Sequence, residues 1–138
     1  MIMWRAWFAV VLSSVMLPAA ALDFSCLQYG PVRIPGTLVR QTYAGPPDYE
    51  SVTKGDQPRV IWILQLDGRT CVDADRRYPR EIVQLEIELA LTPEQYRQYR
   101  SLLGQKVLVT GELRHGGANY QKRLVITPSD IQKTSLLP

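Results

Sequence analysis

Few residues of this 138-residue sequence have the types and spacing that metal chemistry requires. The single histidine, His115, cannot build a zinc site unless carboxylates or thiolates lie beside it. Asp73 and Asp75 form an Asp-x-Asp pair, but a calcium loop needs further oxygen ligands at set spacing, and Arg76 and Arg77 follow instead. We therefore expect no metal and no other cofactor, with His115 as a solvated loop residue. The alternative is a weak surface contact between this histidine and copper or zinc.

Glu86 and Glu88 form a carboxylate pair of the kind that glycosidases use. On a strand they would lie on the same face, roughly 7 Å apart. They alternate with the apolar residues Leu85, Ile87 and Leu89, which is typical of the solvated face of a half-buried strand. The sequence also lacks a G-x-S-x-G motif and a phosphate-binding glycine loop. We therefore predict no catalytic residues and a protein that is not an enzyme.

The remaining side chains with suitable chemistry are tyrosines and arginines, which are enriched at binding hot spots. Three arginines lie within residues 76–80 beside Tyr78, and guanidinium groups bind carboxylates, phosphates and acidic protein surfaces. The alternative to ligand binding is a structural role, in which the tyrosines pack over one end of the fold and the arginines are only solvated. The candidate ligand-binding residues are Tyr43, Tyr49, Arg59, Arg76, Arg77, Tyr78, Arg80, Arg114, His115 and Tyr120.

One short helix is predicted after Thr92, among segments that otherwise alternate like strands. Thr92 and Gln95 have the spacing of a capping box, and Pro93 suits the first helical position. Gly104 would end the helix in a left-handed conformation. The helix has an apolar stripe at helical spacing, formed by Tyr96, Tyr99, Leu102 and Leu103. A helix of about three turns is not stable alone, so we expect it to plug the open end of a small barrel.

The strand pattern predicts a mostly β fold: a five-stranded OB-like barrel with one short helix between strands 3 and 4. Residues 67–68, Asp-Gly, indicate a tight turn after the second strand. Residues 41–58 form a long irregular loop between the first two strands, and such loops are often functional. The predicted strands begin near residue 32 and then cover 59–66 with a short extension at 70–72, 81–89, 107–113 and 120–127.

Residues 1–21 have the pattern of a secretory signal peptide. A positive charge at Arg5 precedes an apolar run, and Ala19-Ala20-Ala21 matches an A-x-A cleavage site, with an uncleaved anchor as the alternative. Cleavage leaves a single domain, residues 22–138, of 117 residues (138 minus 21) and no membrane span. Its 15 Lys and Arg (16 minus Arg5) against 13 Asp and Glu are too balanced to favour nucleic acid.

The two cysteines, Cys26 and Cys71, both follow the predicted cleavage site. A periplasmic or secreted protein folds in an oxidising compartment, so we expect one disulfide between them rather than a reactive thiol or a metal ligand. The bond would close a loop of about 45 residues and contribute on the order of 3–4 kcal/mol.

Residues 31–126 contain three motifs: GTLVRQTYAGPPDYES followed by Gly55-Asp56, ILQLDGRTCV, and LLGQKVLVTGEL. On these motifs the sequence resembles a family of small exported bacterial domains that is catalogued as a domain of unknown function. The resemblance implies an OB-like fold and export, and it implies no reaction. Such domains often have a histidine-bearing segment between the last two strands, which is here His115-Gly116-Gly117.

We therefore predict an exported, non-catalytic OB-fold binding module whose partner is another envelope or secreted protein, or an envelope polymer. Export and charge argue against nucleic acid, and the oligomeric state is not indicated. One alternative is an inhibitor or immunity protein against an envelope-acting toxin or hydrolase, which a protruding 41–58 loop with an exposed Tyr49 would favour. The other is a small-ligand or metal-responsive envelope stress protein.

Overall fold

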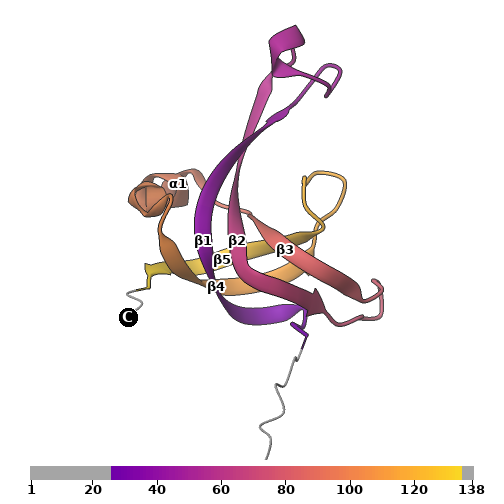
Figure 1. The fold of residues 1–138 in the computed structure, drawn as a ribbon, viewed down its shortest axis with the longest axis vertical. Helices are drawn as coiled ribbons and strands as arrows, with labels where there is room; N and C mark the ends of the chain where they lie inside the picture. Colours follow the sequence, from indigo (N-terminus) through magenta and orange to yellow (C-terminus); the bar gives the residue numbers. More distant parts are fainter. Residues whose placement is uncertain (1–25, 135–138) are drawn as a thin grey trace, which may run out of the picture.

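The chain folds into a mostly β structure with one short helix (Figure 1). The computed structural model describes residues 26–134, so the predicted signal peptide lies outside the described residues. Within this range no helix is long and apolar enough to cross a membrane. The elements are β1 (Gly30–Ala44), η1 (Val52–Lys54), β2 (Pro58–Val72), β3 (Glu81–Leu89), α1 (Pro93–Tyr99), η2 (Arg100–Leu102), β4 (Lys106–His115) and β5 (Leu124–Lys133).

The five strands form a sheet that closes on itself in the order β1-β2-β3-β5-β4. Strand β1 closes the ring because its second half pairs with β2 and its first half pairs with β4. The strand can bend between these partners at Gly36, where an added Cβ would lie 2.5 Å from the carbonyl oxygen of Gln65. Strands β3 and β5 are parallel and pair at Glu88 and Leu89, which makes their junction the shortest in the ring.

Three strand boundaries differ from the sequence prediction. Strand β1 continues to Ala44 by pairing with β2, so residues 41–44 do not belong to the predicted loop of residues 41–58. The predicted turn at Asp67-Gly68 is wrong, because β2 runs continuously through it and only its register with β3 shifts between Gln65 and Thr70. A bulge there bends the strand without reversing it. The last strand is present, but its predicted bounds of 120–127 are wrong, because β5 runs from Leu124 to Lys133. Strand β5 tolerates Pro128 because its pairing with β4 shifts register next to this proline.

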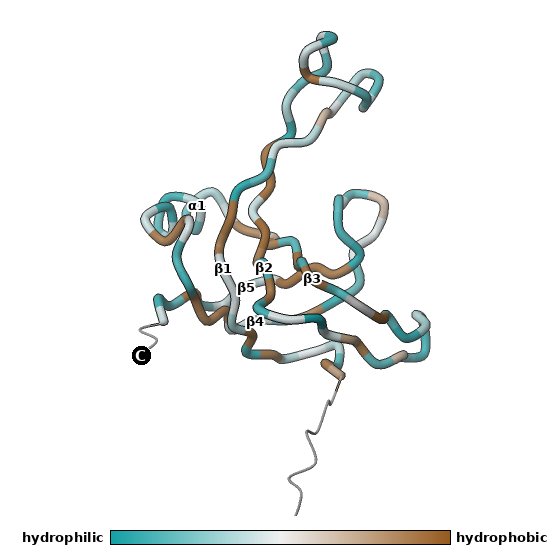
Figure 2. The backbone as a smooth tube through the Cα atoms, in the orientation of Figure 1, coloured by the Kyte–Doolittle hydropathy of each residue, from teal (hydrophilic) through white to brown (hydrophobic). Residues whose placement is uncertain are grey.

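Helix α1 has the predicted N-terminus. The Thr92 side chain accepts a hydrogen bond from the Gln95 backbone N–H, and the Gln95 side chain accepts one from the Thr92 N–H. The helix packs Tyr99 into the core and Tyr96 edge-on against Trp62, with ring centroids 5.1 Å apart. As Figure 2 shows, the hydrophobic segments lie mainly in the strands of the closed sheet. The largest fully buried side chains are Leu38, Ile63, Leu64, Ile87, Leu113, Leu124 and Ile126.

The predicted disulfide between Cys26 and Cys71 is present, with a sequence separation of 45 residues. It joins the segment before β1 to the end of β2. Two backbone hydrogen bonds reinforce the link, from Leu27 N–H to the Cys71 carbonyl and from Asp73 N–H to the Leu27 carbonyl, each 2.8 Å. The described part of the chain contains no free cysteine, so the disulfide uses both thiols.

Candidate functional site

The structure divides the predicted binding residues among three places rather than one. Tyr49 lies in the connection between β1 and β2, shortly before η1. Tyr43 and Arg59 lie at the base of that connection, beside the loop of residues 116–123 that joins β4 to β5. The remaining candidates lie around the connection between β2 and β3 and the end of β4: Arg76, Arg77, Tyr78, Arg80, Arg114, His115 and Tyr120.

The connection between β1 and β2, residues 45–57, projects well beyond the closed sheet and is here named the arm (Figure 1). One buried carboxylate organises it. Asp56 accepts hydrogen bonds from the backbone N–H groups of Asp48, Glu50 and Ser51 at 3.0, 2.8 and 2.9 Å. These bonds, led by the one from Ser51, hold the pKa of Asp56 below its usual value. The arm is therefore a structured projection, although the sequence reads as an irregular loop.

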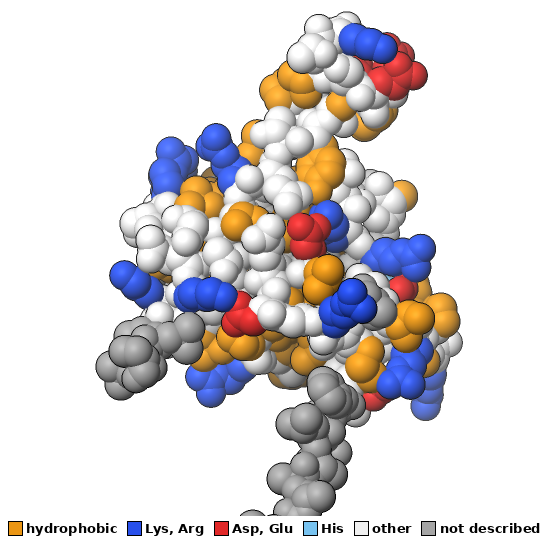
Figure 3. Space-filling view, viewed as in Figure 1, with side chains coloured by type: hydrophobic (Ala, Val, Ile, Leu, Met, Phe, Trp, Pro, Cys, Tyr) orange, Lys and Arg blue, Asp and Glu red, His pale blue; other side chains and the backbone are white. Residues whose placement is uncertain are grey.

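The surface of the arm combines apolar and charged side chains. Tyr49 is 60% exposed and has a φ of 59°, a left-handed conformation that is uncommon outside glycine. Val52 is also exposed, and Asp48 and Glu50 flank Tyr49 as exposed acidic residues. Acidic, basic and hydrophobic side chains all reach the surface of the arm in Figure 3. The arm thus presents an aromatic side chain between two carboxylates, away from the rest of the molecule.

The loop of residues 116–123 is held by glutamates of β3, which corrects the prediction that Glu86 and Glu88 are solvated. Glu88 is 3% exposed and accepts hydrogen bonds from the N–H groups of Gln121 and Lys122 at 2.7 and 3.1 Å. Glu86 is half-buried and pairs with the Lys122 ammonium. The bond from Lys122 is the largest reason that the pKa of Glu86 lies below its usual value. The two carboxylates bind the loop at the short junction between β3 and β5.

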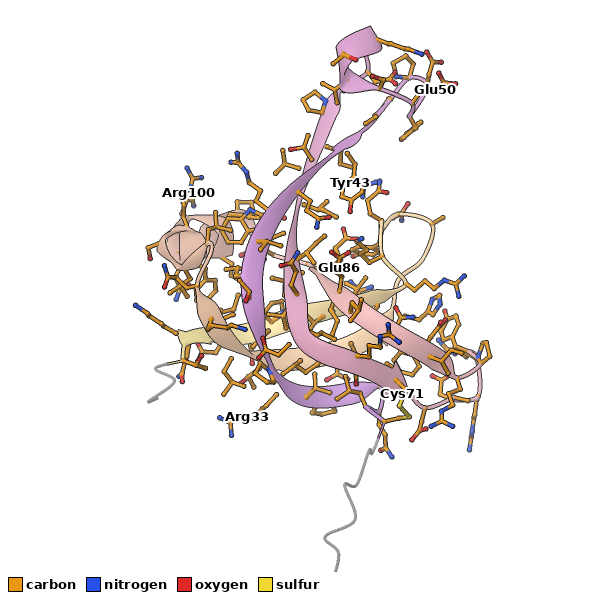
Figure 4. The ribbon with its side chains drawn as sticks, in the orientation of Figure 1. Arg33, Tyr43, Glu50, Cys71, Glu86 and Arg100 are labelled. Carbon is orange, nitrogen blue, oxygen red and sulfur yellow. A yellow bond between two sulfur atoms is a disulfide. The ribbon has the colours of Figure 1, made fainter. Side chains whose placement is uncertain are left out.

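Tyr43 and Arg59 belong to the same network. Gln41 donates to Glu86 at 3.2 Å and accepts a hydrogen bond from the Tyr43 hydroxyl, while the Lys122 ammonium lies 5.7 Å from the centre of the Tyr43 ring. The Arg59 guanidinium donates to the carbonyl of Asn119. In Figure 4, Tyr43 and Glu86 lie beside this loop, whereas Glu50 lies on the distant arm. These side chains hold the loop against the sheet, so their polar groups are largely used within the protein.

The third place is a hollow of about 300 Å³, here named the aromatic hollow, and its lining residues are Tyr29, Asp75, Arg77, Tyr78, Arg114 and His115. The rings of Tyr78 and His115 stack with centroids 4.0 Å apart and an angle of 6° between their planes. Tyr29 meets Tyr78 edge-on, with centroids 6.2 Å apart. Asp75 accepts hydrogen bonds from the N–H groups of Arg77 and Tyr78, which lower its pKa and shape the loop that carries them.

His115 is not the solvated turn residue that the sequence predicts. It is the last residue of β4, and its side chain is 22% exposed. Its Nε2 lies 3.7 Å from a carboxylate oxygen of Glu81, a buried residue that also lies 3.3 Å from Arg123. The prediction failed because the pairing of β4 with β5 continues to His115 and Leu124, so His115 belongs to the strand and the loop begins at Gly116.

The arginines around the aromatic hollow differ in how they are engaged. Arg114 donates to the Tyr120 hydroxyl at 2.7 Å and stacks over the ring of that residue. Arg80 lies 3.7 Å from Asp73 and donates to the sulfur of Cys26 at 2.7 Å. The side chains of Arg76 and Arg77 form no hydrogen bond or ion pair with residues 26–134. Of the two arginines that line the hollow, Arg77 therefore has all its side-chain N–H donors available for a ligand, whereas Arg114 does not.

Sequence reasoning missed Tyr29, Asp56, Glu81 and Lys122. Tyr29 enters the hollow because the disulfide at Cys26 brings the start of the chain beside the loop after Cys71. This placement could have been inferred from the expected disulfide, because Cys26 lies three residues before Tyr29 and Cys71 lies four residues before Asp75. No group of three or more potential metal ligands occurs among residues 26–134.

The fold and these surfaces define a small, mostly β domain with a closed sheet, one helix and a projecting arm. Residues 86–129 match the family model described as Domain of unknown function (DUF4431). The match begins in β3, includes α1 and β4, and ends within β5, so it includes Glu88 and His115 but neither the arm nor the cysteines. It confirms the expected resemblance to a domain of unknown function. The comparison with curated proteins finds no match.

Proposed function

We propose that the chain is an exported, non-catalytic OB-like binding module that recognises another protein through its arm. The OB-like assignment is supported by the strand order β1-β2-β3-β5-β4, the parallel pairing of β3 with β5 and the helix between β3 and β4. Export is supported by the signal-like residues 1–21 and by the disulfide, since disulfides persist in oxidising compartments. OB folds bind ligands with the loops that join strands 1–2 and 4–5.

The observation that carries this proposal is the organised arm with its exposed Tyr49. A loop that is already ordered loses little conformational entropy on binding, and tyrosine is enriched among binding hot spots. The three hydrogen bonds to Asp56 supply that order, and Tyr49 supplies the anchor. The exposed carboxylates of Asp48 and Glu50 favour a partner with an apolar pocket and a basic rim.

Site-specific photo-crosslinking in the extracytoplasmic fraction of producing cells tests this proposal. The Tyr49→benzoylphenylalanine variant places a crosslinker on the exposed surface of the arm, and the matched Lys133→benzoylphenylalanine variant places it at an exposed site at the far end of β5. We expect a discrete protein adduct from position 49 and none from position 133. Adding Asp56→Ala to the first variant should abolish the adduct, because the backbone on both sides of residue 49 loses its support.

Equal adducts from both positions, or an adduct at position 49 that survives Asp56→Ala, would contradict recognition by an organised arm. A wild-type complex that forms without any adduct at position 49 would place the interface elsewhere. Both variants alter exposed residues, so circular dichroism should show unchanged folding. The identity of a crosslinked protein then separates an assembly partner from an enzyme.

A second candidate function is inhibition of an envelope-acting hydrolase or toxin. The projecting arm with an exposed Tyr49 favours this candidate, because a rigid loop can enter an active-site cleft. It predicts that the captured partner is an enzyme, that the wild type inhibits it in stoichiometric amounts, and that Tyr49→Ala weakens inhibition at least tenfold. Capture of an enzyme whose activity is unaffected by saturating protein would exclude it.

A further inference from the structure

We propose that the aromatic hollow binds a carboxylate group, carried either by a small organic acid or by the C-terminus of a peptide. The hollow lies around the β2–β3 connection, remote in sequence from the arm, so this site stands apart from the proposed recognition of a protein by the arm. Three features support it: unpaired positive charge, buried polar atoms without partners, and walls that are fixed in place.

The charge of the lining fits a monoanion. Arg77 and Arg114 contribute two positive charges, and Asp75 contributes one negative charge. The Arg77 side chain has no partner among residues 26–134, and the guanidinium of Arg114 keeps N–H donors beyond those directed at Tyr120 and Thr127. The lining therefore has a net charge of +1, which a carboxylate with its single negative charge would neutralise. Guanidinium groups also match the planar geometry of a carboxylate, whereas a phosphate dianion would leave one negative charge uncompensated.

Two buried polar atoms at the hollow lack hydrogen-bond partners within residues 26–134: the hydroxyl oxygen of Tyr29 and Nδ1 of His115. Buried polar groups without partners are rare in folded proteins and need an explanation. Burial, and then the charge of Glu81, raise the pKa of Tyr29, so its hydroxyl stays protonated and can donate. A neutral imidazole carries one N–H, and with that proton on Nδ1 the His115 ring would be a further donor to the same group.

The two sides of the hollow are fixed before any ligand arrives. Tyr29 follows Cys26, and the loop of Asp75, Arg77 and Tyr78 follows Cys71, so the disulfide fixes the spacing between the two sides. Asp75 shapes that loop from within through its two backbone hydrogen bonds. The Tyr29 and Tyr78 rings offer apolar surface to the body that carries the carboxylate. A fixed site of this kind binds without a large ordering cost.

Two-dimensional NMR titration of the oxidised domain with benzoate tests the proposal, and a short peptide with a free or an amidated C-terminus separates the two sources of carboxylate. We expect saturable shifts at residues 29, 75–78 and 114–115. Arg77→Gln should weaken binding at least tenfold, because it removes the charge that pairs with the ligand. Arg76→Gln, at the neighbouring exposed arginine, is the matched control and should leave the affinity unchanged.

Tyr29→Phe is the decisive variant, because it keeps the ring and removes only the unpaired hydroxyl. If that hydroxyl binds the ligand, affinity should fall several-fold; if it is merely an unpaired core group, affinity should stay the same and stability should stay the same or rise.

Saturable binding of the free peptide but not of its amide assigns the site to a C-terminus, and binding of benzoate alone assigns it to small acids. Non-saturable shifts, or equal losses from Arg76→Gln and Arg77→Gln, would overturn the proposal. Tyr49→Ala should leave these titrations unchanged, so failure here and failure of the arm proposal are distinguishable.

Discussion

The arm and the loop of residues 116–123 are both long connections between antiparallel strands, yet they are ordered by opposite means. Asp56 orders the arm from within, through backbone groups five to eight residues away in the sequence. The β4–β5 loop is ordered from outside, by Glu86 and Glu88 of β3, which lie 33 to 36 residues away. The arm can therefore keep its shape while projecting into solvent, whereas the loop, despite two backbone hydrogen bonds of its own, is anchored by side chains of the sheet.

This difference indicates how each connection is coupled to the stability of the domain. The arm makes its key contacts with itself, so its disorder should cost the closed sheet little. The loop is held at the junction of β3 and β5, where strand pairing is shortest, so its loss should open the ring. Four predictions test this difference, beginning with the core of the closed sheet and ending with the arm.

The largest effect is expected from Trp62→Ala, which removes a core side chain that is 4% exposed and packs against Tyr96. Deleting a buried aromatic side chain costs roughly 3–5 kcal/mol. Chemical denaturation monitored by circular dichroism should show that loss in the free energy of unfolding. A loss below about 1 kcal/mol would mean that the closed sheet does not depend on this strand.

Glu88→Ala should have the next largest effect, about 1.5–3 kcal/mol, because it leaves the N–H groups of Gln121 and Lys122 without their charged acceptor. Amide exchange should accelerate in residues 116–123 and in the first residues of β5. Glu88→Gln is the matched control, because its amide oxygen can still accept these bonds and should preserve most of the stability. Equal losses from both variants would show that packing, rather than the carboxylate's hydrogen bonds, holds the loop.

Acid should loosen the β4–β5 loop by a smaller amount. The pKa of Glu86 is lowered in the folded state, first by its hydrogen bond from Lys122, so its contribution is complete above the ordinary value of 4.5. That contribution is lost as pH falls through the lower folded value. NMR shifts of Lys122 should therefore be constant from pH 7 to 5 and change only below 4.5. In a Lys122→Met variant the transition, followed at the backbone amide of residue 122, should move to higher pH, because the largest cause of the lowered pKa of Glu86 is gone. A transition near neutral pH in the wild type would contradict the assignment.

The smallest effect on global stability is expected from Asp56→Ala, although it should be the most disruptive change within the arm. The N–H groups of Asp48, Glu50 and Ser51 lose their acceptor, so their exchange with solvent should accelerate several-fold. The midpoint of thermal unfolding should stay within experimental error of the wild type. A clear drop in that midpoint would show that the arm and the sheet are coupled, and the contrast with the loop would fail.

Short-range sequence signals predicted the parts of the fold that short-range contacts determine. The capping box at Thr92 and the left-handed conformation of Gly104 follow from residues within a few positions of each other, and both are present. The predicted helix length was wrong, because α1 ends at Tyr99 and the chain continues to Leu102 as the 3-10 turn η2. The disulfide was predictable because only two cysteines were available. The Asp67-Gly68 turn was wrong because β2 pairs with β3 on both sides of it, at Gln65 and at Thr70, which keeps β2 extended through a sequence that would otherwise favour a turn.

The candidate sites were predictable only where their residue types were unusual. Tyr78, Arg77 and His115 were selected as a tyrosine, an arginine and the single histidine, but their meeting in one hollow depends on the closure of the sheet. Glu88 lies between the core residues Ile87 and Leu89, which is the position that a solvated residue takes in a half-buried strand. Its burial depends on the β4–β5 loop folding over the outer face of β3, a contact between segments more than 30 residues apart.

The disulfide also determines how the molecule would respond to mechanical load. A pull on the chain before Cys26 would pass through the sulfur atoms to Cys71 at the end of β2, instead of peeling β1 away from β4 one hydrogen bond at a time. The load would then be shared by β1 and β2, which pair with each other from Thr37 to Ala44 and from Pro58 to Gln65. A domain tethered at its amino end could thus bear tension on the arm while its ring of strands stays shut.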